Sequence, residues 1–165
     1  MIRDPHLYPP IANESVHDVV LTPFMVRVRE ATTGGDSTAT LVFRRSRPEK
    51  IAVALWEWFG LRIKAEHVIA EANSMLTAGA DPIILEDECG TGHLSFTLRW
   101  RDRSVTVGVD QDDMHSGQIV AESDQFGPGG NAEILPNDED FLEELAISLV
   151  AITPPTIRVK EDDNE

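Results

Sequence analysis

The spacing of apolar residues near the N-terminus predicts a first β-hairpin. Apolar side chains recur at every second position in residues 24–28 and again in residues 39–43, with arginine and threonine among the residues between them. Residues 32–36 contain the threonines and glycines of a loop, where a turn needs positive φ angles. Antiparallel pairing then places Phe24 opposite Phe43 and makes one face of the hairpin apolar.

A second hairpin is predicted by stricter alternation further along the chain. Apolar residues alternate with polar ones in residues 94–100, and valines alternate in residues 105–109. A tight turn between these segments places Trp100 opposite Val105, with the apolar side chains on one side. Residues 118–122 offer a third strand, which extends the hairpin into a meander.

Three helices are predicted from the helical spacing of apolar residues and from capping signals. The first runs over about 47–59 and ends at Gly60, and the second follows the apolar positions within 65–76. The last helix starts with Asn137 as its N-cap and stops before Pro154.

These elements together predict one α+β domain over residues 18–153. Its two antiparallel hairpins or meander pack against two central helices and the C-terminal helix. Residues 1–17 are expected to form an irregular proline-rich arm, and residues 154–165 an acidic tail. The length of 165 residues suits a single domain.

Charge and composition exclude several classes of function. The chain has 14 basic and 29 acidic residues, a net charge of -15, and such a field repels nucleic acids and anionic membranes. No apolar run reaches the roughly 20 residues that span a bilayer, and no secretory signal is visible. The single cysteine allows no internal disulfide. We therefore expect a soluble protein, cytoplasmic or virion-associated rather than secreted.

The Cys89 and His93 pair is one candidate for catalysis. A thiol nucleophile needs a base within hydrogen-bond reach, and His93 could reach Cys89 across the glycines between them. The spacing identifies no orienting side chain and no oxyanion hole. We therefore expect residues 86–93 to form an acidic surface loop, with catalysis as the weaker alternative.

A second candidate is the acidic segment that follows residues 105–109. Its polar residues are Asp110, Asp112, Asp113 and His115. Carboxylates at a strand end can hold a divalent cation, but the EF-hand spacing fails here because Met114 stands at the fifth loop position. We expect solvated turn residues, with weak metal binding as the alternative. Without a nucleotide or zinc motif, no cofactor is expected.

The arginines gather on and beside the two predicted hairpins and form a candidate partner-binding surface. These residues are Arg44, Arg45, Arg47, Arg99, Arg101 and Arg103, with Arg27 and Arg29 on the first hairpin. Such a polarised surface suits docking onto a protein or self-association of a basic face with an acidic one. The alternative is that polar strand faces use arginine simply for solubility.

Trp56 is the remaining candidate, because it falls on the polar side of the first predicted helix. Another segment, such as the N-terminal arm, is the expected cover for it. The alternative is that Trp56 is exposed as an anchor for a partner.

The sequence thus predicts a non-enzymatic protein-protein interaction module, such as an inhibitor, immunity or accessory factor that docks on a larger protein. One alternative is a structural subunit of a large assembly such as a virus particle. Another is an enzyme or metal-binding protein that uses residues 110–115 or the pair of Cys89 and His93.

Overall fold

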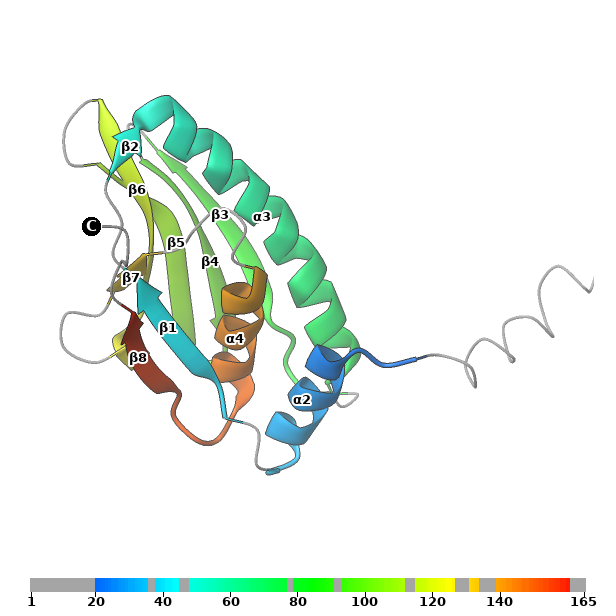
Figure 1. Ribbon diagram of the computed structural model, residues 1–165. Helices are drawn as coiled ribbons and strands as arrows, with labels where there is room; N and C mark the ends of the chain where they lie inside the picture. The colour runs from blue at the N-terminus through cyan, green and yellow to red at the C-terminus, as the bar shows by residue number, and fades with distance from the viewer. Residues whose placement is uncertain are drawn as a thin grey trace, which may run out of the picture.

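Eight strands in the described part of the chain join in one sheet, and helices cover one of its faces (Figure 1). The computed structural model describes residues 20–35, 38–44, 48–76, 79–90, 93–111, 115–126, 131–133 and 139–160. Helices on a mostly antiparallel sheet make this a single mixed α+β domain, which confirms the predicted fold class. The predicted N-terminal arm lies outside the described residues.

The sheet has the strand order β3-β4-β5-β6-β7-β1-β8. The remaining strand, β2, also pairs with β6. The strands are β1 (Thr40–Arg44), β2 (Glu49–Lys50), β3 (Ile84–Gly90), β4 (His93–Trp100), β5 (Arg103–Gln111), β6 (Ser116–Glu122), β7 (Asn131–Glu133) and β8 (Thr156–Lys160). β1 and β8 run parallel, whereas the other pairs are antiparallel. β8 belongs to the segment 154–165, so part of the predicted tail pairs with the sheet instead.

The helix α2 (Pro23–Thr32) shows that the predicted first hairpin is wrong. Thr22 caps this helix, because its Oγ1 accepts a 3.1 Å hydrogen bond from the backbone N–H three residues further on. Phe24 and Val28 are buried, and their spacing of four residues fits a helix as well as a strand. β1 pairs instead with β8 from Thr40 to Arg44, and with β7 at Arg44.

The helix α3 (Ile51–Ser74) replaces the two central helices that the sequence predicts. Gly60 does not end it, because buried residues continue on the same face before and after the glycine. These buried residues are Ala54, Trp58, Leu61, Ala65, Val68, Ile69 and Ala72. Packing of this face against the sheet outweighs the low helix propensity of one glycine.

The meander from β3 to β6 confirms the second predicted hairpin but corrects its register. Trp100 pairs with Arg103, and Leu98 pairs with Val105, two positions from the predicted pairing. A shift by two residues keeps every side chain on its predicted face. Arg101 forms the tip with a φ of 57°. The acidic residues 86–88 belong to β3, so the loop predicted there is wrong.

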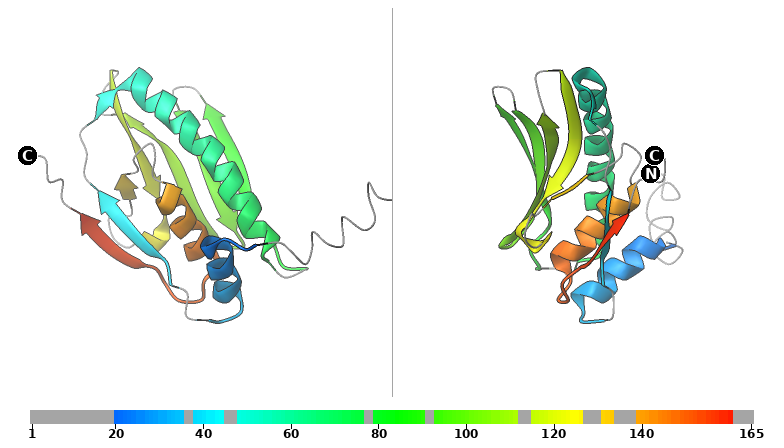
Figure 2. Two further views of the ribbon diagram at one scale, coloured as in Figure 1. Left: turned by 45° about the vertical axis from the view of Figure 1, so that its right-hand side comes forward. Right: turned by 60° about the vertical axis from the view of Figure 1, so that its left-hand side comes forward.

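The core lies between the helices and the sheet. The predicted C-terminal helix is confirmed as α4 (Glu139–Val150), although the predicted N-cap Asn137 lies outside the described residues. α4 contacts β4 and β5 on one side and β1 on the other, and Figure 2 shows the sheet curving around it. The inward residues of α4 are Phe141, Leu142, Leu145, Ala146 and Leu149, all buried as predicted. None of the described helices is long and apolar enough to span a bilayer.

Candidate functional site

The long helix α3 has two apolar faces, of which the domain covers one. On the inner face, Trp58 is 2% exposed, and its Nε1 donates a 3.0 Å hydrogen bond to the carbonyl oxygen of Val107 in β5. On the outer face, Trp56 is 79% exposed and Ile63 is 57% exposed. The outer face is therefore an exposed apolar face on a helix whose opposite face packs in the core.

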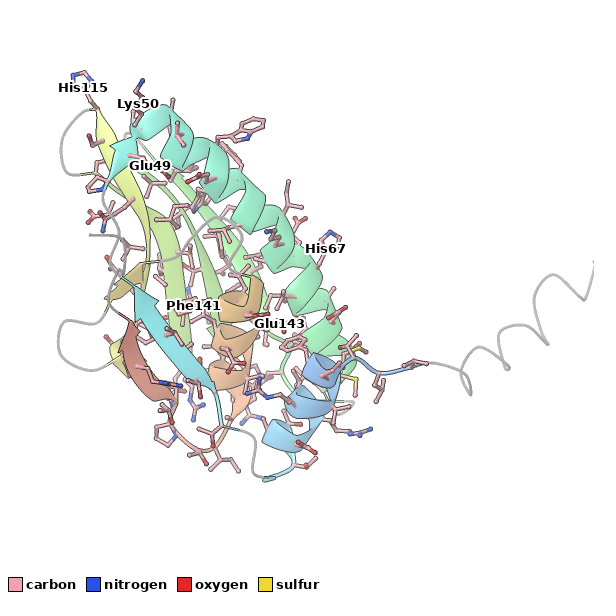
Figure 3. All side chains as sticks on the ribbon, in the orientation of Figure 1. Glu49, Lys50, His67, His115, Phe141 and Glu143 are labelled. Atoms are coloured by element: carbon pink, nitrogen blue, oxygen red, sulfur yellow. The ribbon has the colours of Figure 1, made fainter. Side chains whose placement is uncertain are left out.

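The outer face contains a stripe with alternating spacings of three and four residues. We call this the outer stripe; its members are Val53, Trp56, Gly60, Ile63, His67 and Ala70. Figure 3 shows His67 pointing away from the sheet, as its place in the stripe requires. Phe59 lies beside the stripe and is half exposed. The same spacing is found for the seam residues of helices that pack along one another.

Gly60 lies at the middle of the outer stripe, and no packing among the described residues requires a glycine there. A Cβ atom built on Gly60 would meet no atom within 4 Å among its surroundings. Glycine inside a helix costs about 1 kcal/mol relative to alanine. Gly60 therefore leaves open space on the outer face of α3.

Charged residues with seven-residue spacing flank one side of the outer stripe. They are Lys50, Glu57, Lys64 and Glu71. Lys50 is exposed and the other three are half-buried. Figure 3 shows Lys50 and Glu49 where α3 begins. Burial, and then a hydrogen bond and repulsion from the carboxyl group of Glu49, raise the pKa of Glu57 to about 7.

The arginines that the sequence singles out do not share one surface. Arg99 forms a 2.9 Å ion pair with Glu86 in β3. Arg103 pairs with Trp100, and the side chains of Arg99 and Trp100 point to opposite faces of the sheet. The side chain of Arg103 therefore lies on the face opposite that of Arg99. Its Nη1 donates to carbonyl oxygens at the C-terminal end of α4, at 2.7 Å for Ala151, and so stabilises that helix end.

The other predicted partner-binding arginines are placed as follows. Arg101 stacks 4.2 Å from the ring centre of Trp100 and makes a 3.2 Å ion pair with Asp81. Arg44 belongs to β1, and its side chain is not among those that the structure describes. Arg45 and Arg47 lie outside the described residues. Arg27 and Arg29 lie on α2 instead of a hairpin.

An ion pair that the sequence pattern did not reveal joins α2, α4 and β1. Arg27 forms a bidentate pair with Glu144, and the hydrogen bond to this carboxylate raises the arginine's pKa. Oε1 of Glu144 also accepts a 2.8 Å hydrogen bond from the backbone N–H of Thr40. The two residues are far apart in sequence, so no local spacing could have indicated their contact.

The two candidate catalytic clusters gain little from the structure. Cys89 pairs with Leu94 and His93 pairs with Gly90 in the β3–β4 ladder, and the side chains of Cys89 and His93 are not among those described. Asp110 is the second-last residue of β5 and His115 is exposed, while residues 112–114 lie outside the described part. Within that part, no three His, Cys, Asp or Glu residues are grouped so that they could hold a metal ion.

The face of the sheet opposite the helices carries an open pocket of about 280 Å³. Its lining residues include Ser95, Thr106, Gly108, Asp110, Val120 and Glu122. Gly108 forms part of the lining, where an added Cβ would approach the Cβ of Ser95 to 3.0 Å. Two carboxylates, Asp110 and Glu122, give the pocket an acidic character. The hydroxyl group of Ser95 in its lining donates a 3.4 Å hydrogen bond to Glu88.

Comparisons with known proteins add no relative to this picture. No protein-family model matches the chain, and neither curated proteins nor solved structures give a match. The outer stripe is therefore the feature on which a functional proposal rests. The seven-residue repeat of the outer stripe can be seen in the sequence. The helix predicted to end at Gly60, however, contains only part of the stripe.

Proposed function

We propose that this chain is a non-enzymatic protein-binding module and that the outer stripe of α3 is its docking surface. The observation that carries the proposal is the 79% exposure of Trp56 on an apolar helix face. Tryptophan is enriched among the residues that dominate binding energy at protein interfaces. Exposed apolar surface of this kind is typical of interaction sites.

The shape and polarity of the surface favour a protein as the ligand. Small molecules bind in concave pockets, whereas the outer stripe is the convex side of a helix. Nucleic acids are disfavoured by the net charge of -15. An apolar helix face with charged flanks is instead the surface that another helix packs against.

This proposal suits the roles of an inhibitor, an immunity protein or an accessory factor. It also suits the alternative of a subunit in a larger assembly. In each role the chain provides a rigid helix, held by the sheet, and contributes binding rather than chemistry. The predicted arginine surface becomes a secondary proposal, because Arg99, Arg101 and Arg103 all have partners within the chain.

Site-specific photo-crosslinking in the cells that produce the protein tests this proposal. A photo-reactive amino acid at position 63 should give one discrete protein adduct. The matched control is position 152, because Ile152 is also an exposed isoleucine, at 74% against 57% for Ile63. The control should give no such adduct.

A second substitution separates a specific complex from chance contact. Val53→Glu places a charge in the outer stripe about three turns from the crosslinker and should abolish the adduct at position 63. The proposal is wrong if positions 63 and 152 give the same adducts, or if position 63 gives none.

A further inference from the structure

The charges beside the outer stripe alternate in sign along the helix. Lys50, Glu57, Lys64 and Glu71 lie on one flank, and successive members differ by seven residues. Seven residues are close to two helical turns, so Glu57, Lys64 and Glu71 form one row on α3. Lys50, the last residue of β2 and the N-cap of α3, stands at the start of this row. Above the pKa of Glu57, which is about 7, the row has the order plus, minus, plus, minus and matches its own reverse, in which each charge meets its opposite.

An antiparallel pair of α3 helices uses this property. When the two helices cross near residue 60, Lys50 of one copy lies beside Glu71 of the other, and Glu57 lies beside Lys64. Symmetry repeats each contact, because a two-fold interface uses the same surface on both copies. A parallel pair would instead bring Glu66 beside Glu71, since the two flanks then face each other.

The same alignment matches large and small residues of the outer stripe. Ile63 of one copy lies over Gly60 of the other, where the missing side chain leaves space. Trp56 lies opposite His67, and Val53 lies opposite Ala70, so each apolar side chain meets a smaller one. This arrangement gives Gly60 a role that contacts within the chain do not supply.

The charge of α3 differs from that of the chain as a whole. Residues 49–74 contain four acidic and three basic side chains, whereas the whole chain has a net charge of -15. Repulsion between two strongly acidic molecules is weakest where the surfaces that meet are close to neutral. The outer stripe and its flanks provide such a surface.

We propose that the occupant of the outer stripe is a second copy of this chain, with the two α3 helices antiparallel. This proposal rests on the proposed function, since it names the partner of the same docking surface. It combines an apolar seam, the open space at Gly60 and a self-complementary row of charges. The pairing makes the chain a symmetric dimer or the repeating contact of a larger assembly.

Sedimentation equilibrium on the purified full chain tests the pairing. Between about 1 µM and about 500 µM, the range in which weak dimers form, the mass should rise from one chain to two. Lys64→Glu should weaken association about tenfold, because two attractive contacts become repulsive. The matched control is Arg99→Glu, which changes the net charge equally but lies on the sheet and should leave association unchanged.

Mixing of charge-reversed chains tests the alignment itself. Glu57→Lys alone should weaken association as Lys64→Glu does. An equal mixture of the two variants should recover the dimer, because every contact between the different chains is then attractive. Lys50→Glu and Glu71→Lys provide a second, independent pair for the same experiment if a variant in the first pair does not fold.

The outcomes distinguish this proposal from the proposed function. A chain that stays monomeric over the whole range, or a dimer that none of the reversals weakens, overturns the antiparallel pairing. If the chain is monomeric but position 63 still crosslinks to a different protein, the docking surface stands and the second copy is excluded. If both experiments are negative, both proposals fail.

Discussion

Trp56 and Trp58 are two residues apart on α3 but lie in opposite environments. Trp58 is 2% exposed and hydrogen-bonded to the sheet, whereas Trp56 is 79% exposed. Two residues turn a helix by about 200°, so one tryptophan must leave the core when the other enters it. Trp58 therefore serves folding, whereas we assign Trp56 to binding.

Substitution of each tryptophan by alanine should have opposite consequences. Trp58→Ala removes a core side chain that also packs on Phe96, and it should cost about 3 to 5 kcal/mol of unfolding free energy. Trp56→Ala should change the unfolding free energy by less than about 0.5 kcal/mol, because it is exposed. Urea denaturation of dilute protein measures both. A large loss of stability in Trp56→Ala would show that another part of the chain covers this residue.

The pair of Arg27 and Glu144 should contribute strongly to stability. Glu144→Ala removes the acceptor for Arg27 and for the backbone N–H of Thr40, and it should cost about 1 to 3 kcal/mol. Asp140→Ala is the control, since Asp140 is an exposed carboxylate on the same helix. Equal effects of the two substitutions on the urea midpoint would contradict this role for Glu144.

Glu57 should make stability depend on pH. Its pKa is about 7 in the folded chain against an ordinary value of 4.5, so the folded state binds the proton more tightly. Stability should therefore fall as the pH rises from about 4.5 to about 7 and then level off, since the unfolded chain loses the proton first. Glu57→Gln cannot ionise and should lack this part of the decline.

The measurement is the melting temperature of both forms at pH 5 and pH 8, in protein dilute enough to be monomeric. The glutamine variant should gain stability relative to the original chain at pH 8 and show a smaller difference at pH 5. A difference that is the same at both values would mean that Glu57 has no raised pKa.

Gly60→Ala should stabilise the monomer and weaken association. The added methyl group meets no atom within 4 Å, so the gain in helix propensity of about 0.5 to 1 kcal/mol is not opposed. In the proposed dimer the same methyl group fills the space under Ile63 of the other copy. Melting and sedimentation of this variant should therefore change in opposite directions. A more stable variant with unchanged association would leave Gly60 without a binding role.

The meander could be predicted because strict alternation of apolar and polar residues over residues 94–100 and 105–109 fits a strand and does not fit a helix. Prediction from the sequence failed for α2, where Phe24 and Val28 satisfy both periods and only contacts with distant elements decide between them. It also ended a helix at Gly60, because the burial that carries α3 through this residue comes from the sheet. Local pattern thus identified elements whose periodicity was unambiguous.

Prediction of the candidate site was limited by the same cause. Trp56 stands out in the sequence because it lies beside Glu57, away from the predicted inward face of a helix that is predicted to end at residue 59. That Trp56 belongs to the outer stripe can be seen only when the full length of α3 is known. The partners of Arg99 and Arg103 could not be predicted, because they follow from strand register and from the position of α4.

The native mass of the chain in an extract of its own cells tests the docking surface most directly. The original chain and Ile152→Glu should both migrate in a complex larger than one chain, whereas Ile63→Glu should migrate as a folded monomer. Both variants add one negative charge at an exposed isoleucine, so only the location of the change differs. A monomeric original chain, or a complex that survives Ile63→Glu, would contradict a docking surface on α3.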